Sequence, residues 1–286
     1  MPPVTAVLLS VLSFSLMGVC VKALGGRLPV SEVVLARSVV SLAISQAMLQ
    51  HAGLSPWGPR WRMLTLRGLF GTLALYGLFA AYSVLPLAAV TVIQFLNPAL
   101  TALLAWWCLA ERPSATIALG LLLGWLGVVV LLAPGTPASL PLTGVLLAAG
   151  SSLLAALAYV SVRSLARSVP TLVIVYWFPL VGVLLSLPAL LLEPVLPTPR
   201  EGLLLLGVGV FTHLGQLGLT RGLAQLPAAR ATALTYGQVP LAACWGWLFF
   251  GEVPAGTVLL AALLVLASTW LSLRPSPPPP PRSGNA

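Results

Sequence analysis

Long apolar runs with few charged residues, each about the length of a membrane-spanning helix, fill this chain almost from end to end. A helix needs about 20 apolar residues to cross the hydrocarbon core of a bilayer. Ten such runs can be marked, separated by short segments rich in Pro, Gly and Arg. They are Val4–Leu24, Val30–Leu49, Leu66–Leu85, Leu87–Leu109, Ser114–Ala133, Leu142–Arg163, Thr171–Leu192, Glu201–Leu223, Ala228–Phe250 and Ala255–Leu273. The runs do not alternate with a period of two, so they predict helices and not barrel strands.

The composition agrees with a membrane protein. Apolar residues make up 59% of the chain and charged residues only 7%, against about 25% charged residues in soluble domains. The net charge of +9 comes from arginines scattered singly at the ends of the runs, so we expect membrane lipids and no nucleic acid as partners. Cys20, Cys108 and Cys244 lie in apolar runs without metal-ligand spacing, and we predict no cofactor or metal site.

The sequence also contains an internal repeat. Pro86 and Pro227 lie 141 positions apart, and so do Glu111 and Glu252. A proline in the middle of the run recurs at an interval of 142, so the second copy carries one extra residue there. Because these prolines and glutamates recur in the same order at a nearly constant interval, they indicate an internal duplication with five runs in each copy.

Arginine placement predicts the orientation of the two copies. With the N-terminus in the cytoplasm, ten basic residues fall on the cytoplasmic side: Arg60, Arg62, Arg67, Arg112, Arg163, Arg167, Arg221, Arg230, Arg274 and Arg282. Lys22, Arg27 and Arg200 fall on the opposite side, which favours cytoplasmic termini. An odd number of spans per copy then inverts the second copy. The predicted fold is an all-α integral membrane protein with ten transmembrane helices as two inverted five-helix repeats. The repeats would cover residues 1–134 and 135–274, followed by a disordered Pro-rich cytoplasmic tail over residues 275–286.

Polar residues inside the runs are the candidate substrate-binding groups, because a polar side chain in hydrocarbon needs a partner or a water-filled cavity. Gln94, Asn97 and Thr101 share one helix face. Pro98 is expected to free the carbonyl of Gln94, which gives an irregular polar patch in mid-span. The second copy repeats the arrangement with Thr235, Tyr236, Gln238 and Pro240. An interhelical hydrogen bond near a kink is the alternative for both patches.

Three further candidates carry open alternatives. Arg37 either anchors an anionic group or pairs structurally with Glu32 or with backbone carbonyls. His213 shares a face with Gln216 and Thr220, and either recognises substrate, couples protons or packs as a hydrogen-bonded histidine. Trp177 could stack on a substrate or serve as packing. The tyrosines that fit the same description are Tyr76, Tyr82 and Tyr159.

Two recurring features are expected to be structural. Glu111 and Glu252 precede Pro113 and Pro254, where a carboxylate would cap the start of the following span. The small residues Gly120, Gly124 and Gly127 line one stretch of the fifth run. They indicate close helix packing within one subunit, with a homodimer contact as the alternative.

Together these residues resemble the EamA family of the drug/metabolite transporter superfamily. In the first copy the resemblance is carried by Arg37, Arg67-Gly68, Gly71, Ala81–Pro86, Asn97-Pro98, Leu109–Arg112 and the three glycines of the fifth run. In the second copy it is carried by Tyr159, Leu226–Ala228 and Phe250–Glu252. The resemblance covers about residues 4–273. It implies a basket-like inner-membrane carrier of small metabolites, with the fifth and tenth spans outside a central cavity and alternating access as the mechanism.

The function predicted from the sequence is a secondary transporter, expected to be an exporter and not an enzyme, with a small-molecule substrate. An intramembrane enzyme acting on a lipid-linked substrate is one alternative, although the chain has no Asp for an acid dyad or triad. A non-transporting scaffold or sensor is the other, although a scaffold does not need a polar interior. The predicted substrate-binding residues are Arg37, Gln94, Asn97, Trp177, His213, Gln216, Tyr236 and Gln238.

Overall fold

The computed structural model describes residues 2–94, 96–132, 140–192, 195–252 and 256–273, and these ranges contain helices and no strand. The first half holds α1 (Pro3–Ala23), α2 (Val30–His51), α3 (Trp61–Val84), α4 (Leu87–Ile93), α5 (Leu96–Leu109) and α6 (Ala115–Leu132). The second half holds α7 (Leu142–Leu165), α8 (Thr171–Leu192), α9 (Pro199–Gln225), α10 (Ala228–Ala233), the 3₁₀ turn η1 (Leu234–Gly237), α11 (Gln238–Phe250) and α12 (Gly256–Leu273). The predicted repeat boundary and the predicted tail lie outside the described residues.

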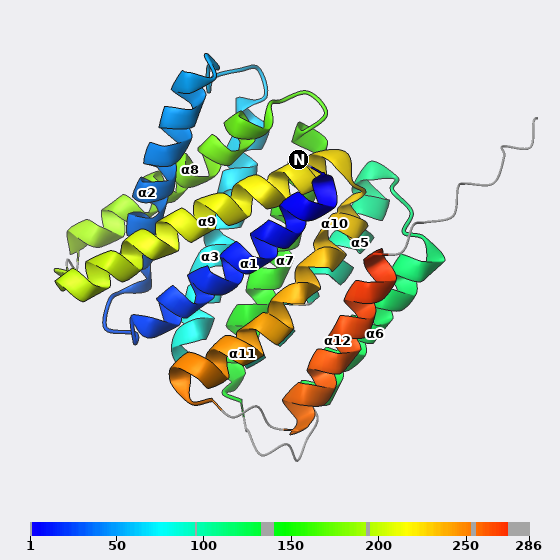
Figure 1. Ribbon diagram of the computed structural model, residues 1–286. Helices are drawn as coiled ribbons and strands as arrows, with labels where there is room; N and C mark the ends of the chain where they lie inside the picture. Colours follow the sequence, from blue (N-terminus) through cyan, green and yellow to red (C-terminus); the bar gives the residue numbers. More distant parts are fainter. Residues whose placement is uncertain (1, 95, 133–139, 193–194, 253–255, 274–286) are drawn as a thin grey trace, which may run out of the picture.

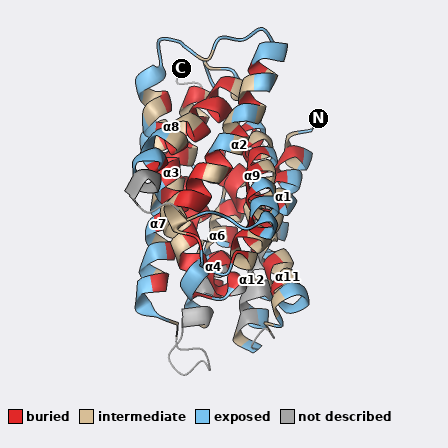
Figure 2. Cartoon of the chain, turned by 90° about the vertical axis from the view of Figure 1, so that its left-hand side faces the viewer, coloured by how far each residue is buried: buried red, intermediate tan, exposed pale blue. Residues whose placement is uncertain are grey.

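The protein is a multi-pass membrane protein. Within the described ranges, seven helical segments are long and apolar enough to cross a bilayer. Large apolar side chains point outward from these helices, as Trp107 does with 86% of its surface exposed. Figure 2 shows the buried residues on the inner faces of the bundle and the exposed ones on its periphery. In a soluble protein such a surface would aggregate, so lipid is its natural surroundings.

Helices far apart in the sequence pack side by side. The neighbouring pairs are α1 with α9, α3 with α7, α2 with α8, and α6 with α12. Figure 1 shows α6 and α12 together at one edge of the bundle. Each half therefore contributes to the packing of the other, so the two halves form a single bundle.

The spans predicted to be irregular are irregular. The predicted fourth span comprises the separate helices α4 and α5. In the predicted ninth span, η1 interrupts the helix at Leu234–Gly237. One detail of the prediction was wrong: the Gln94 carbonyl is not left free by Pro98, because it accepts a 3.0 Å hydrogen bond from the backbone N–H of Asn97.

Arg67 corrects the predicted start of the third span. The prediction began that span at Leu66 and assigned Arg67 to the cytoplasmic loop. In the structure α3 begins at Trp61, so Arg67 lies almost two turns inside the helix, with 1% of its surface exposed. The side chain that looked like a loop charge is a buried one.

Glu111 also differs from its predicted role. Its Oε2 accepts a 3.1 Å hydrogen bond from the backbone N–H of Ala228, at the start of α10, and not from the start of α6. Ser114 takes the capping position of α6, since its hydroxyl accepts a hydrogen bond from the N–H of Ile117. The first turn that would follow Glu252 lies outside the described residues.

Candidate functional site

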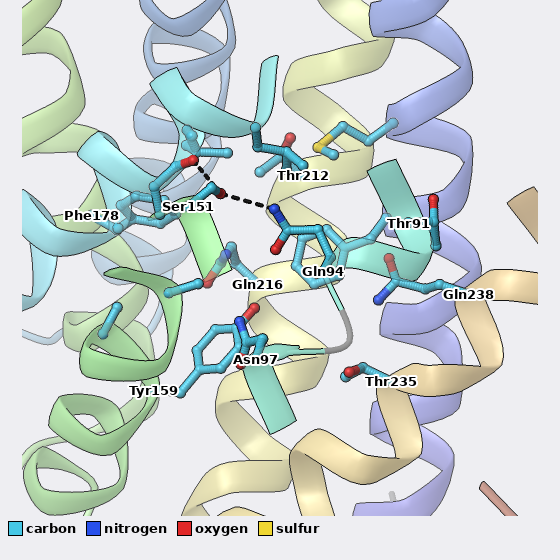
Figure 3. Close-up of a pocket in the computed structure, with 18 of the residues that line it drawn as sticks. Thr91, Gln94, Asn97, Ser151, Tyr159, Phe178, Thr212, Gln216, Thr235 and Gln238 are labelled. Atoms are coloured by element: carbon cyan, nitrogen blue, oxygen red, sulfur yellow. Dashed lines mark hydrogen bonds between the residues drawn. The ribbon is translucent and has the colours of Figure 1, made fainter. Parts of the chain in front are cut away.

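A polar cavity of about 110 Å³ lies inside the bundle, between the two halves of the chain. It is walled by α1, α3, α4, α5, α7, α8, α9, η1, the first residue of α11 and Gln94, which follows α4. Its polar lining consists of Arg67, Tyr82, Thr91, Gln94, Asn97, Ser151, Tyr159, Thr212, Gln216, Thr235 and Gln238. Figure 3 labels most of these side chains and shows them converging from segments far apart in the sequence. A cavity of this volume holds at least a few water molecules, so its polar side chains can be hydrated in the absence of a solute.

Four of the eight residues predicted to bind substrate line this cavity. They are Gln94, Asn97, Gln216 and Gln238. Gln94 follows the end of α4 and Asn97 lies in the first turn of α5, while Gln238 follows η1 in the second half. Each half therefore places its interrupted span against the cavity.

Gln94 is held by the protein itself. Its Nε2 donates to the Ser151 hydroxyl at 3.0 Å and to the Ala148 carbonyl at 3.2 Å. Its Oε1 accepts from the Ser152 hydroxyl at 3.1 Å. Because both ends of the amide are occupied, Gln94 joins α7 to the irregular stretch and has little capacity left for a ligand.

The other amides keep hydrogen-bonding capacity. Asn97 accepts from Thr101 through Oδ1, and Gln216 accepts from Arg67 Nη2 at 2.8 Å. Neither NH₂ group donates a hydrogen bond to another of the described residues. Gln238 makes no side-chain hydrogen bond within the described part of the chain. The hydroxyls of Thr91 and Thr235 donate to carbonyls of their own segments and keep lone pairs as acceptors. The cavity can therefore bind a solute that carries both donors and acceptors.

The other four predicted residues lie outside the cavity lining. Arg37 is fully buried on α2, with its guanidinium carbon 4.5 Å from the ring centroid of Phe178. His213 faces α2, with Nδ1 3.3 Å from the hydroxyls of Ser41 and Ser45.

Trp177 and Tyr236 face neighbouring segments of the chain. The indole N–H of Trp177 donates to the carbonyl of Pro56 at 2.8 Å, in the segment between α2 and α3. Tyr236 lies against Gly124 of α6, where an added Cβ would stand 2.9 Å from its hydroxyl. Gly124 thus packs closely against a residue of the same subunit, while the homodimer alternative for the glycines of the fifth run stays untested.

Sequence reasoning missed Arg67 as a cavity residue. Arg67 Nη2 bonds to Gln216 across the cavity wall, and its guanidinium carbon lies 4.1 Å from the centroid of Phe178. Trp61 was the feature of the sequence that could have indicated this. An aromatic residue at the membrane interface, six residues before Arg67, would start the span early enough to place Arg67 inside it. Phe178, Thr91, Ser151 and Thr212 line the cavity as well.

Two ion pairs join the halves at the ends of the bundle. Lys22 Nζ lies 3.3 Å from Glu252 Oε1 and donates to the Leu85 carbonyl at 2.9 Å. Glu111 binds Arg163 Nε at 2.8 Å and lies 3.6 Å from Arg167 Nη2. Arg163 also donates to the carbonyls of Leu223 and Ala224.

A third ion pair fixes the segment before α2 to the start of α9. Arg27 donates to both carboxylate oxygens of Glu201. This hydrogen-bonded pairing raises the pKa of Arg27 above its usual range. Glu201 also completes a capping box with Thr198 at the start of α9.

Comparison with known proteins gives a consistent family. The EamA-like transporter family matches residues 1–133 and again residues 142–274. The pseudopaline exporter CntI of Pseudomonas aeruginosa is 33% identical over 273 residues, which cover 94% of this chain and 96% of that protein. The human solute carrier family 35 member G1 is 30% identical over 75% of this chain and 62% of its own length.

Two further similarities are more distant. The riboflavin transporter of Rhizobium johnstonii is 28% identical over 75% of this chain and 70% of its own length. A solved crystal structure superposes with a TM-score of 0.77 at 22% identity, covering 95% of this chain and 96% of that one. At that identity the superposition speaks for the fold alone.

Proposed function

The chain belongs to the EamA-like transporter family and is a membrane transporter of small metabolites, and we propose that it exports a polar metabolite by alternating access through the central cavity. The observation that carries this proposal is the polar cavity between the halves. The side-chain NH₂ groups of Asn97, Gln216 and Gln238 line it and donate no hydrogen bond to another of the described residues. Export as the direction is supported by the relative named as an exporter, which matches over 94% of this chain.

We further propose that the transporter has ten spans, arranged as two inverted repeats in an inner membrane with both termini in the cytoplasm. The double family match and the interval of 141 residues support the repeat. The packing supports it too, because exchanging the halves turns the α1–α9 pair into the α7–α3 pair and leaves α2–α8 and α6–α12 as pairs. In an inverted repeat such exchange relates an outward-open to an inward-open state of similar energy.

The two alternatives are less well supported by the cavity. The described residues that line it include no carboxylate, histidine, lysine or cysteine, and the Ser151 hydroxyl donates to the Ala74 carbonyl, so a serine nucleophile would have no usual general base beside it. A scaffold has no need of amide groups without hydrogen-bond partners in a membrane interior, because burying each such group costs free energy. We expect the protein to act without catalysis. A homodimer through the outer helices stays a prediction.

The test is efflux from proteoliposomes. Purified protein is reconstituted, the vesicles are loaded with labelled riboflavin, with pseudopaline or with dicarboxylate metabolites, and efflux is followed with and without a membrane potential. We expect saturable efflux of at least one compound and a slower rate for Gln238→Leu. Efflux no faster than from empty liposomes for every compound, together with turnover of a lipid-linked substrate, would refute the proposal. Ser13→Ala, in which the lost hydroxyl bonds only to its own helix, is the control.

A further inference from the structure

Two arginines lie buried side by side in the interior of the bundle. Arg37 of α2 is 0% exposed and Arg67 of α3 is 1% exposed. Both guanidinium carbons lie within 4.5 Å of the centroid of the same ring, that of Phe178 in α8. The two charges are therefore within about 9 Å of each other, where like charges repel strongly in a medium of low dielectric constant.

Most of the donors on these two side chains are unused. None of the three nitrogens of Arg37 has a hydrogen-bond partner among the described residues, and neither do Nε and Nη1 of Arg67. The buried hydroxyls of Ser38 and Thr72 are likewise without a partner there. Buried polar groups are nearly always hydrogen-bonded, so a cluster of unused donors marks a place built for a ligand.

The hydroxyls belong to the same interface as the arginines. Ser38 follows Arg37 on α2 and Thr72 lies on α3, and both face Gly182, one turn along α8 from Phe178. An added Cβ at Gly182 would collide with the Ser38 hydroxyl and lie 3.6 Å from that of Thr72. The unused donors of α2 and α3 therefore gather along one face of α8.

The described part of the chain supplies no carboxylate to neutralise the pair. Glu111, Glu201 and Glu252 are bound to other cations. Glu32 precedes Arg37 by five residues on α2, but no ion pair joins them and Glu32 Oε2 has no partner. Among the described residues, Arg37 neither pairs with Glu32 nor bonds to a backbone carbonyl, which were the two structural alternatives considered for it. An uncompensated buried charge costs several kcal/mol, which a bound anion would recover.

We propose that Arg37 and Arg67 form a binding site for an oxyanion, a carboxylate or phosphate group carried by the transported metabolite. A guanidinium binds such a group through two parallel N–H donors, and two guanidiniums supply enough donors for all its oxygens. Hydroxyl donors at Ser38 and Thr72 complete the set. The transported metabolite is thus an anion, and this statement rests on the proposed transport function.

The site adjoins the cavity through two shared residues. Arg67 and Phe178 both line the cavity, while Arg37 lies on the α2 side of the same ring system. An oxyanion held by the arginines would leave the rest of the molecule among the amides of Asn97, Gln216 and Gln238. The cluster therefore specifies the charge of the substrate and the amides its uncharged polar groups.

The test measures binding without transport. The melting temperature of the purified protein in a neutral detergent is recorded with succinate, with inorganic phosphate, and with succinamide in chloride at equal ionic strength. A ligand that binds only the folded state raises the melting temperature, so we expect a rise of a few degrees with one or both oxyanions and none with succinamide. A rise with succinate alone assigns a carboxylate, and a rise with phosphate alone assigns a phosphate group.

Variants separate this site from a structural role. We expect Arg37→Gln to abolish the oxyanion-dependent rise and to leave the melting temperature without anion unchanged or higher, since it removes an uncompensated charge. Arg37→Lys should keep part of the rise. Arg221→Gln removes an exposed charge and should behave as the parent protein. If Arg67→Gln does not fold, Arg37→Gln still decides, because Arg37 makes no hydrogen bond in the described structure.

Three results would overturn the proposal. They are an unchanged oxyanion effect in Arg37→Gln, a lower melting temperature of Arg37→Gln without anion, and equal stabilisation by chloride and the oxyanions. The outcome is independent of transport: a protein that binds oxyanions but moves nothing keeps the site and loses the carrier function. A protein that transports only neutral solutes and shows no oxyanion effect keeps the carrier function and loses the site.

Discussion

Arg163 of α7 binds Glu111, beyond the end of α5, with 2.8 Å between Nε and Oε1, and the equivalent pair recurs in the other half. Lys22 lies 141 positions before Arg163, Glu252 lies 141 positions after Glu111, and these two residues also bind each other. Lys22 also donates to the carbonyl of Leu85, which precedes Pro86, and Arg163 donates to the carbonyls of Leu223 and Ala224, in the last turn before Leu226-Pro227. If the halves are inverted, the two ion pairs lie at opposite membrane faces.

Breaking either ion pair should open the cavity toward one side. Glu252→Gln removes the partner of Lys22 and should favour the state open at that end, while Glu111→Gln should favour the opposite state. A partly exposed ion pair contributes roughly 0.2–1 kcal/mol, so we expect labelling rates to change about two- to fivefold. The measurement is labelling of Thr91→Cys by a membrane-impermeant maleimide, applied from each side, in a protein without its three native cysteines.

The side of the membrane from which labelling increases tests this prediction. Increased labelling from the same side in both variants would contradict opposite positions of the two ion pairs. Arg200→Gln, which removes an exposed charge near the start of α9, is the control and should leave both rates unchanged.

The two amides Gln94 and Gln238 should respond differently to the same substitution. Gln94→Leu removes three hydrogen bonds to α7, although the hydroxyls of Ser151 and Ser152 keep carbonyl acceptors, so we expect a loss of about 1–3 kcal/mol in the free energy of unfolding. Gln238→Leu breaks no hydrogen bond of the described structure and should lower apparent substrate affinity roughly five- to tenfold. Melting curves and concentration-dependent efflux separate the two effects, and a destabilised Gln238→Leu protein would count against the assignment.

His213 should not carry protons for transport. Its ring lies between α9 and α2, 3.3 Å from Ser41, Ser45 and the Met48 sulfur, and outside the cavity lining. We expect His213→Gln to retain the pH profile of efflux, with a lower melting temperature as its main effect. A flat pH profile in this variant, at normal protein amount, would show instead that His213 couples protons.

Helix packing should be sensitive at Gly68 and tolerant at Gly150. An added Cβ at Gly68 would stand 2.6 Å from Val181 Cγ2, so Gly68→Ala should cost about 1–3 kcal/mol. Gly150 has nothing within 4 Å, and Gly150→Ala should be neutral or stabilising by up to about 1 kcal/mol. Adding Val181→Ala should restore part of the stability lost in Gly68→Ala. Equal melting temperatures for the two single variants would contradict this packing.

Much of the helical arrangement could be read from the apolar runs. The predicted seventh span has the bounds of α8, and the predicted sixth differs from α7 by two residues at its end. The boundary of α3 could not be read, since Trp61 and Arg62 suit an interfacial helical turn as well as a loop. That uncertainty of a few residues decided whether Arg67 counted as a loop charge or as a buried one.

The sequence predicted which residues share a helix face, but not which helix or cavity each of them contacts. His213 and Gln216 are three residues apart and were expected on one face, yet three residues turn a helix about 60° short of a full circle. That difference lets Gln216 line the cavity while His213 contacts α2. Trp177 and Tyr236 were likewise in plausible positions and face a connecting segment and α6 instead.

The sequence by itself determined the class of protein, because apolar runs of about 20 residues with 7% charged residues leave no stable fold in water. It also determined which spans are interrupted, since Pro and polar residues in a span act locally on the backbone. Only the tertiary structure decided that Arg37 and Arg67 meet at Phe178 without a counter-charge. Their contact with the same ring depends on how α2 and α3 pack on α8. Packing between segments more than 100 residues apart cannot be predicted from a local sequence pattern.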